Sequence, residues 1–395
     1  MRELRPQPPT LRRRNIYLPY DIVLNILTRL PVKSLMRFRC VSKSWNSSII
    51  SSDFISTHLN NNSKDSHGDG YVIHMPCVRD SYSSSINTKR PVCTVALDRT
   101  FDKISEVGIP FHFPFGSAQI VGSCNGLLCF ATSAYCIYLW NPSIRIFKRL
   151  PNTCIGQLRF ATLGFAYHSE NNDYKVVRIS RSPFSAPVSS HEIEVYTLSS
   201  DSWRSVGMSL TTDVLFYDKN YPLPIPLVNG ALHWMSCIVE EEEENHRRRM
   251  IMAFDVNSEK FKRLALPVGS TDENIFQTFL SSFKGKLAFI TWARSEQHGT
   301  QYSIWVMKEY GVVESWIKLS VVPFERVAHC TAFMEYGSLL VCYINDRVES
   351  QEFKFVLVDI ETLHEKKDLD IQHHSYVVTF MESLVLLDGA NVVSY

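Results

Sequence analysis

The stretch NGLLCF at 125–130 decides the fold, because it joins a tight turn to an apolar strand and recurs along the chain. Related stretches are NGALHW at 229–234, KGKLAF at 284–289 and YGSLLV at 336–341. Glycine allows the turn backbone, and the apolar run that follows has the length and composition of a buried strand. The recurrence predicts a repeated β unit rather than a single irregular sheet.

A second unit alternates with the first and sets its spacing. It consists of a strand, a polar turn and a second aromatic residue, as in LWNPSIRIFKRL at 139–150, VYTLSSDSWRSV at 195–206 and AFDVNSEKFKRL at 253–264. The two aromatics lie seven residues apart in each copy. A looser copy begins at Trp305 and a faint one at 358–360. The leading aromatics at 140, 196, 254 and 305 are separated by 56, 58 and 51 residues, a period typical of β-propellers.

Counting these units predicts an all-β propeller of about six blades. Five units are read directly, near 120–151, 163–206, 226–267, 279–319 and 330–368. A sixth is assembled from residues 71–115 together with the last strands at 376–393, and pairing of the two ends hides exposed strand edges. An irregular β-sandwich with accidental Trp and Gly spacing is the alternative.

Residues 15–59 have helical instead of strand periodicity. Ile22, Val23, Ile26 and Leu27 fall on one side of a helix that stops at Pro31, and two further short helices follow. So small a core is marginal alone, which suggests that another chain completes it. The full division is a disordered basic tail at 1–14, a helical module at 15–59, a linker at 60–70 and a β-rich domain at 71–395.

The helical module resembles an F-box. The matching stretches are LPYDI at 18–22, NILTRLPVKSL at 25–35 and RFRCVSKSW at 37–45, although Asn25 and Ser42 replace the Glu and Cys common in plant members. The region that follows is similar to the F-box-associated, kelch-like domain of plant F-box proteins, through GSCNGL at 122–127, NPS at 141–143, DYKVVR at 173–178 and IWVMKEYGV at 304–312. The fold class is therefore a small helical F-box followed by an all-β, kelch-like propeller.

This resemblance implies a substrate-recognition subunit of a Skp1, cullin and F-box (SCF) ubiquitin ligase, which binds a Skp1-like adaptor and through it cullin. The propeller then holds an unknown target protein for ubiquitination and proteasomal degradation. By the same resemblance, the Skp1 contact falls on Leu18, Pro19, Ile22, Ile26, Leu30, Pro31, Leu35, Val41 and Trp45. For Ile26 and Trp45, packing between the helices is an equally good interpretation. The biological pathway and the target stay open.

Four long insertions are candidates for target binding, at 181–191, 211–226, 239–249 and 294–301. The third contains five consecutive glutamates followed by His246 and three arginines, for which a solvated loop is the simpler interpretation. The recurring Trp, Tyr and Phe residues are expected to form blade cores rather than a ligand cage.

Composition excludes several other classes. The 41 Lys and Arg residues nearly balance the 40 Asp and Glu residues, so the overall charge predicts neither a nucleic-acid nor a membrane-surface partner. Apolar runs are of strand length, and the first residues lack a secretion signal. The ten cysteines contain no C-x-x-C pair and are expected to be free buried thiols. We expect a cytoplasmic or nuclear protein, with Arg12-Arg13-Arg14 as a weak import motif.

Motifs for catalysis are absent, so the sequence predicts a chain that is not an enzyme and needs no cofactor. H-E-x-x-H, G-x-x-x-x-G-K, G-x-G-x-x-G and G-x-S-x-G do not occur. The pair His373-His374 is a poor chelate, because neighbouring strand residues point to opposite faces. The alternatives are a Skp1-binding scaffold outside a ligase, or a kelch-like carbohydrate-binding or oxidase propeller, which as an oxidase needs copper ligands of the Tyr and His type.

Overall fold

Hairpin turns with left-handed backbone organise the β-rich part of the chain. Asn125 and Gly126 have φ angles of 53° and 77°, and Lys284 and Gly285 have 48° and 70°. Two consecutive positive φ values define the tight turn whose twist matches that of antiparallel strands. The first repeated sequence unit is therefore the hairpin that joins the first two strands of a blade.

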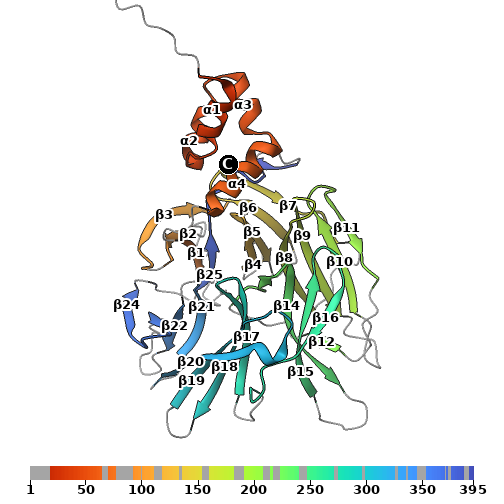
Figure 1. The fold of residues 1–395 in the computed structure, drawn as a ribbon, viewed down its shortest axis with the longest axis vertical. Coiled ribbons are helices and arrows are strands. Elements are labelled where there is room, and N and C mark those ends of the chain that lie inside the picture. Colours follow the sequence, from red (N-terminus) through yellow and green to blue (C-terminus); the bar gives the residue numbers. More distant parts are fainter. Residues whose placement is uncertain are drawn as a thin grey trace, which may run out of the picture.

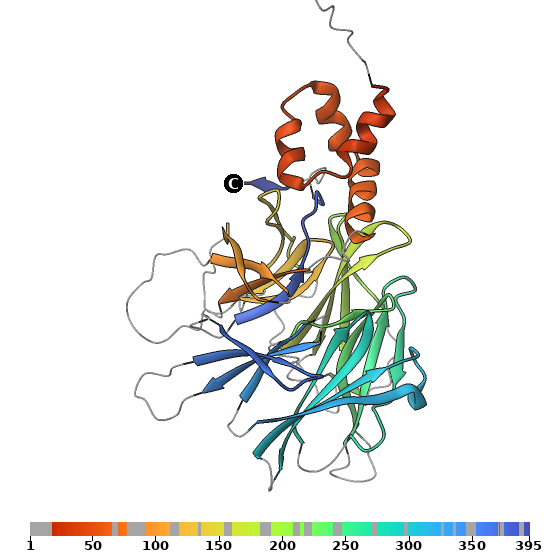
Figure 2. The same ribbon diagram turned by 60° about the vertical axis from the view of Figure 1, so that its left-hand side comes forward.

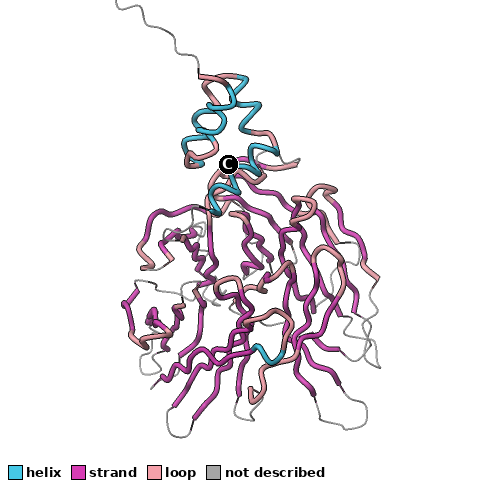
Figure 3. Tube along the Cα trace, in the orientation of Figure 1, coloured by secondary structure: helices cyan, strands magenta, loops and turns pink. Residues whose placement is uncertain are grey.

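In its described residues, the computed structural model contains four N-terminal α-helices followed by six antiparallel sheets arranged in a ring (Figures 1 and 3). This confirms the predicted fold class, an N-terminal helical module and a six-bladed all-β propeller. The described residues are 18–64, 70–76, 92–98, 100–110, 118–132, 136–153, 160–181, 191–207, 214–216, 223–239, 247–270, 275–295, 299–324, 328–334, 337–344, 353–369, 371, 375–386 and 391–395.

The blades are numbered in chain order, and in blades 2, 3, 5 and 6 the first strand lies at the inner edge of its sheet. Blade 1 contains β1 (Tyr71–Pro76), β2 (Val92–Leu97) and β3 (Lys103–Gly108), and blade 2 contains β4 (Ala118–Cys124), β5 (Leu127–Thr132), β6 (Ile137–Asn141) and β7 (Ile146–Arg149). Blade 3 contains β8 (Phe160–His168), β9 (Asp173–Arg181), β10 (His191–Thr197) and β11 (Ser202–Ser205). Blade 4 contains β12 (Val214–Phe216), β13 (Leu227–Val228), β14 (Ala231–Val239), β15 (Arg247–Asp255) and β16 (Phe261–Leu264).

The remaining two blades complete the ring. Blade 5 contains β17 (Ile275–Phe283), β18 (Lys286–Ser295), β19 (Gly299–Met307) and β20 (Trp316–Phe324), with the short helix η1 (Val313–Ser315) before its last strand. Blade 6 contains β21 (Ala328–Phe333), β22 (Ser338–Ile344), β23 (Phe353–Asp359) and β24 (Glu365–Leu369).

The two ends of the β domain close the ring, as the sequence predicts. Strand β25 (Ser375–Phe380) pairs antiparallel with β1, with Tyr71 opposite Phe380, and becomes the innermost strand of blade 1. The last strand, β26 (Val393–Ser394), differs from the expectation. It pairs with β7 at the outer edge of blade 2, with Val393 opposite Phe147, and does not join the closing blade.

The second repeated unit is a cross-strand aromatic pair between the third and fourth strands. Trp140 lies opposite Phe147 and Tyr196 lies opposite Trp203, and the same register places Phe254 opposite Phe261. Trp140, Tyr196 and Phe254 are fully buried, which confirms that these aromatics form blade cores. Aromatic cross-strand pairs of this kind stabilise neighbouring strands.

Blade 5 shows why its copy of the repeat is loose. The register of β19 and β20 shifts between Ile304 and Trp305, so that Trp305 faces Lys318 instead of an aromatic residue. The Lys318 ammonium lies 4.9 Å from the centre of the Trp305 ring. A cation over an indole replaces the ring pair of the other blades.

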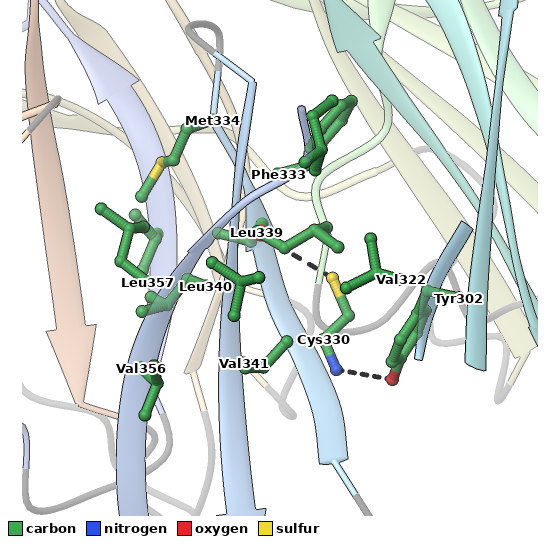
Figure 4. Packing of buried hydrophobic residues seen from close by; sticks show 14 of the residues in the cluster. Tyr302, Val322, Cys330, Phe333, Met334, Leu339, Leu340, Val341, Val356 and Leu357 are labelled. Carbon is green, nitrogen blue, oxygen red and sulfur yellow. Dashed lines mark hydrogen bonds between the residues drawn. The ribbon is translucent and has the colours of Figure 1, made fainter. Parts of the chain in front are cut away.

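Apolar packing continues from blade to blade. In the largest cluster, which spans blades 5, 6 and 1, the backbone N–H of Cys330 donates to the Tyr302 hydroxyl at 2.8 Å (Figure 4). The described cysteines are all free; six are buried, Cys136 is half-buried and Cys40 is exposed. Burial raises the pKa of the Cys330 thiol to about 12, as expected for a packing residue rather than a reactive one.

The N-terminal module consists of α1 (Tyr20–Leu27), α2 (Val32–Phe38), α3 (Lys43–Ile49) and α4 (Ser52–Lys64). The three predicted short helices are present. The predicted linker at 60–70 is wrong in its first half, because residues 60–64 continue α4 through its last turn. Asn62 lies within bonding reach of His58, one turn earlier, and this local support is not visible in a run of polar residues.

Helix α4 packs the module against the propeller. Phe54 and Ile55 are buried in one cluster with Leu384 and with residues of blades 2 and 3. Asn172, in the turn between β8 and β9, donates to Ser56 at 2.8 Å. The helices therefore stand at the end of the propeller where the hairpin turns lie, beside the C-terminus, and they project from it in both views (Figures 1 and 2).

The segment 381–386 is held between the module and blade 2. The Asn141 side chain, which is fully buried, donates to the carbonyls of Ser383 at 3.0 Å and Val385 at 2.8 Å. A Cβ atom on Gly126 would lie 2.3 Å from the Met381 carbonyl oxygen, so this position requires glycine. Residues of the sequence motifs at 125–126 and 141–143 therefore pack against and bind the segment 381–386.

Candidate adaptor-binding surface

Local sequence defines where the small helices begin. Pro19 and Pro31 occupy the position before the first residue of α1 and of α2, each preceded by leucine. Proline has the right φ angle for a helix start and lacks an N–H group that would stay unpaired there. Ser42 caps α3 by accepting from the backbone N–H of Trp45 at 3.1 Å.

The module exposes large apolar side chains on α1, just before it and just after α2, which together we call the apolar face. Leu18 is 53% exposed, Ile22 43%, Ile26 48% and Val41 62%. Pro19 and Pro31 are also exposed. Ile22 and Ile26 are four residues apart and share one side of α1, and Leu18 lies just before the helix. Six of the nine residues assigned to the adaptor contact therefore lie on the surface, and four of these are large aliphatic side chains.

The other three assigned residues lie deeper. Leu35 is fully buried with Leu27 and Ile49, so its side chain cannot contact a partner in this conformation. Its position beside Val32 on the inward side of α2 explains the difference. Leu30 and Trp45 are half-buried, and Trp45 packs edge-on against Phe38 with 5.7 Å between ring centres. Trp45 thus holds α2 against α3, whereas Ile26 is free to contact another chain.

Tyr20 is a further exposed residue of α1 that was not among the assigned residues. Its ring is 44% exposed, and its hydroxyl lies 2.6 Å from the Ser48 hydroxyl and 3.1 Å from that of Ser44. The four-residue spacing of the two serines places both on one side of α3. That spacing, combined with an aromatic residue after Pro19, is the sequence signal that could have identified Tyr20.

A buried histidine holds α4 to the rest of the module. His58 is fully buried, and its Nε2 lies 2.9 Å from the Leu30 carbonyl oxygen. The Phe54 ring stacks on the imidazole at 6.4 Å between ring centres. Burial lowers the pKa of His58, which favours the neutral ring. The surface formed by α1 and α2 is therefore rigidly connected to the helix that contacts the propeller.

The end of the propeller opposite to the F-box carries the loops that join the second and third strands of the blades. In a four-stranded antiparallel blade, the loop between the second and third strands leaves the end opposite to the two hairpin turns. The predicted insertions at 181–191, 239–249 and 294–301 connect such strands in blades 3, 4 and 5. Residues 240–246, with the glutamate run, lie outside the described residues, as do most of the other insertion residues.

Two properties of the described residues bear on other functions. No group of three or more His, Cys, Asp or Glu side chains there is placed to hold a metal ion, and the pair His373-His374 lies outside the described part. None of the described helices is both long and apolar enough to cross a membrane.

Comparison with known proteins assigns both parts of the chain. Residues 17–57 match the F-box domain, and residues 80–387 match the F-box associated beta propeller domain. The F-box/kelch-repeat protein At3g23880 of Arabidopsis thaliana is 28% identical, covering 78% of this chain and 79% of the relative. The F-box protein CPR1 of Arabidopsis thaliana is 26% identical, covering 87% and 82%.

Solved structures give a weaker similarity. The Dos1 propeller has a TM-score of 0.30 and 11% sequence identity, over 74% of this chain and 64% of that chain. A similarity of this size bears on neither fold nor function, and the assignment comes from the sequence families.

The chain thus combines a helical module that has an exposed apolar face with a six-bladed propeller. The chain belongs to the plant F-box proteins that carry an F-box associated β-propeller domain. Members of this family are generally non-catalytic substrate adaptors, and the F-box in general binds Skp1-type proteins.

Proposed function

We propose that this chain is the substrate-recognition subunit of an SCF ubiquitin ligase. The F-box binds Skp1 and thereby cullin, and the propeller binds a target protein that is ubiquitinated and degraded. The observation that carries the proposal is the exposed apolar face of α1 and the loop after α2. Exposed apolar side chains that gather on a small module mark an interaction site, and each large one contributes about 1.5 to 3 kcal/mol when buried.

The contact between α4 and the propeller supports the same role. The two binding regions form one packed body through Phe54, Ile55 and the Ser56–Asn172 hydrogen bond. A ligase without its own catalytic residues works by holding the target near the reactive thioester of a conjugating enzyme. A fixed angle between the F-box and the propeller favours such positioning, with the target on the propeller end opposite to the hairpin turns.

The Skp1 contact is tested with a double variant and a matched control. Ile22→Ala with Ile26→Ala removes two exposed side chains of α1, and we expect the affinity for purified Skp1 to fall by at least about 100-fold. Ile104→Ala is the control, because Ile104 is 51% exposed on β3 of the propeller. Isothermal titration of the full chain measures both. Unchanged binding by the double variant contradicts the assignment.

Ligase activity requires a second measurement. A target captured by the propeller is mixed with this chain, Skp1, cullin and the ubiquitin-activating and ubiquitin-conjugating enzymes. We expect ubiquitin transfer to depend on Ile22 and Ile26. Skp1 binding without any transfer to a bound target would instead assign the chain as a scaffold outside the ligase.

A further inference from the structure

The balanced charge of the chain hides an unequal distribution. Residues 1–64 carry 11 Lys and Arg against 3 Asp and Glu, a net charge of +8, whereas residues 65–395 carry 30 against 37, a net charge of −7. Charge asymmetry between two parts of a chain points to electrostatic interaction by one of them. Within the described helices, 18–64, the excess is +4.

Three of these cations lie close along the chain to residues of the exposed apolar face. Arg29 comes three residues after Ile26, and its backbone N–H donates to the Ile26 carbonyl at 3.2 Å, so the helical path continues to it. Lys33 and Arg37 lie one turn apart on α2. The N–H of Cys40 donates to the Arg37 carbonyl at 3.1 Å, which extends the path toward Val41. Lys33, Arg37 and Val41 are therefore spaced by four residues.

These three side chains are exposed and have no counter-ion among the described residues. The propeller is different, since its buried cations Lys148, Lys175 and Arg178 each pair with a carboxylate. We name Arg29, Lys33 and Arg37 the cationic rim. The helical spacing places the rim next to residues of the apolar face, an arrangement that resembles the polar edge around the core of a protein interface.

We propose that the cationic rim binds an acidic surface of Skp1 next to the groove that receives the apolar face, and that it sets the rate of association. This rests on the proposed function and adds the charge of the partner surface to it. Complementary charges at the edge of an interface steer the encounter and act mainly on the association rate constant, while buried apolar contacts govern dissociation. The acidic propeller of this chain does not satisfy the rim, since none of its carboxylates pairs with it in the described parts.

The test compares association rates at several salt concentrations. Full-length wild-type chain, Lys33→Glu with Arg37→Glu, and the control Lys260→Glu with Lys308→Glu are mixed with Skp1 in a stopped-flow instrument between about 0.05 and 0.5 M salt. Lys260 and Lys308 are exposed propeller cations, so the control makes the same change in total charge. We expect the rim variant to associate about tenfold more slowly at low salt, with a dissociation rate changed less than about twofold.

The outcomes separate this proposal from the proposed function. Convergence of rim variant and wild type at high salt, with the control equal to wild type throughout, supports the rim. A salt-independent wild-type rate, or equal effects of the rim and control variants, overturns it while leaving Skp1 binding intact. Absence of Skp1 binding by the wild type overturns the proposed function itself. A salt-sensitive self-association in sedimentation that the rim variant loses, with its Skp1 association rate unchanged, overturns the proposal in favour of a second copy.

Discussion

The helices and the propeller of this protein treat apolar and charged side chains in opposite ways. The propeller buries Trp140, Trp234, Tyr196 and Phe254 completely and pairs its buried cations with carboxylates. The F-box leaves Ile22, Ile26 and Val41 exposed, and Arg29, Lys33 and Arg37 have no counter-ion among the described residues. A module whose core is small gains from completion by a partner, whereas a closed ring is complete without one. The exposed apolar residues of the F-box are therefore available for a contact with another chain, whereas the buried residues of the propeller serve its own packing.

The largest expected effect separates the two parts by stability. Trp234 is fully buried, and its indole N–H donates to the Thr162 hydroxyl of the neighbouring blade at 3.1 Å. Trp234→Ala should lower the free energy of unfolding by about 3 to 5 kcal/mol, because it leaves a cavity between blades 3 and 4. Urea unfolding at pH 7 measures this loss.

The separation of the two parts is contradicted if Trp234→Ala also affects binding by the F-box surface. Below its unfolding transition, the Trp234→Ala protein should bind Skp1 within about twofold of wild type, while Ile26→Ala should leave unfolding within about 0.5 kcal/mol. A loss of Skp1 affinity in Trp234→Ala comparable to that of the F-box double variant would show that the two parts are not separable.

The second effect is a loss of propeller stability in acid. Burial lowers the pKa of His233 to about 4, in a site where its Nε2 lies 2.8 Å from the Tyr310 hydroxyl of the next blade. The unfolded chain binds the proton near pH 6.5 and the folded chain only near 4. Stability is therefore full above pH 6.5 and falls toward pH 4, by at most about 3 kcal/mol for this residue.

His233→Gln checks this dependence. Glutamine does not titrate, so the slope of the unfolding free energy between pH 4 and 6.5 should decrease by about 1.4 kcal/mol per pH unit. His364→Gln, an exposed propeller histidine, is the control and should leave the slope unchanged. An unaltered slope in His233→Gln would show that the folded protein takes up the proton at this site.

The smallest effect concerns the junction between the two parts. Asn141→Ala removes the donors to the carbonyls of Ser383 and Val385 and should cost about 1 to 3 kcal/mol. We expect faster amide hydrogen exchange in 381–386 and in α4, which packs on this segment. Asn257→Ala, which loses only an exposed bond to Glu170, should leave that exchange as in wild type. Equal protection in both variants would show that other contacts hold the segment.

Much of this architecture is predictable from the sequence because it rests on local signals that repeat. Asn-Gly turns and aromatics seven residues apart each specify a hairpin, and several copies specify a ring. The sequence assigns the last strand, β26, to the wrong blade. Two residues are too few to show a strand periodicity, and the partner strand β7 lies about 245 residues earlier in the chain.

The F-box surface shows the limit of helical periodicity. A period of 3.6 residues groups Ile22, Ile26 and Leu27 on one apolar side, but it does not say that Leu27 faces the core while Ile22 and Ile26 face outward. For the same reason, periodicity did not show that Leu35 faces the core of the module. The cationic rim was missed for a different reason, since the total charge of +1 sums two parts of opposite sign.

Closure of the ring by β25 imposes an order on synthesis. The innermost strand of blade 1 is made about 300 residues after its neighbour β1, so the nascent chain presents complete helices long before it can finish its first blade. A product that stops before residue 375 keeps the F-box but has an unclosed propeller with free strand edges. Under the proposed function, such a fragment would occupy Skp1 without delivering a target, and would act as a competitor of the intact protein.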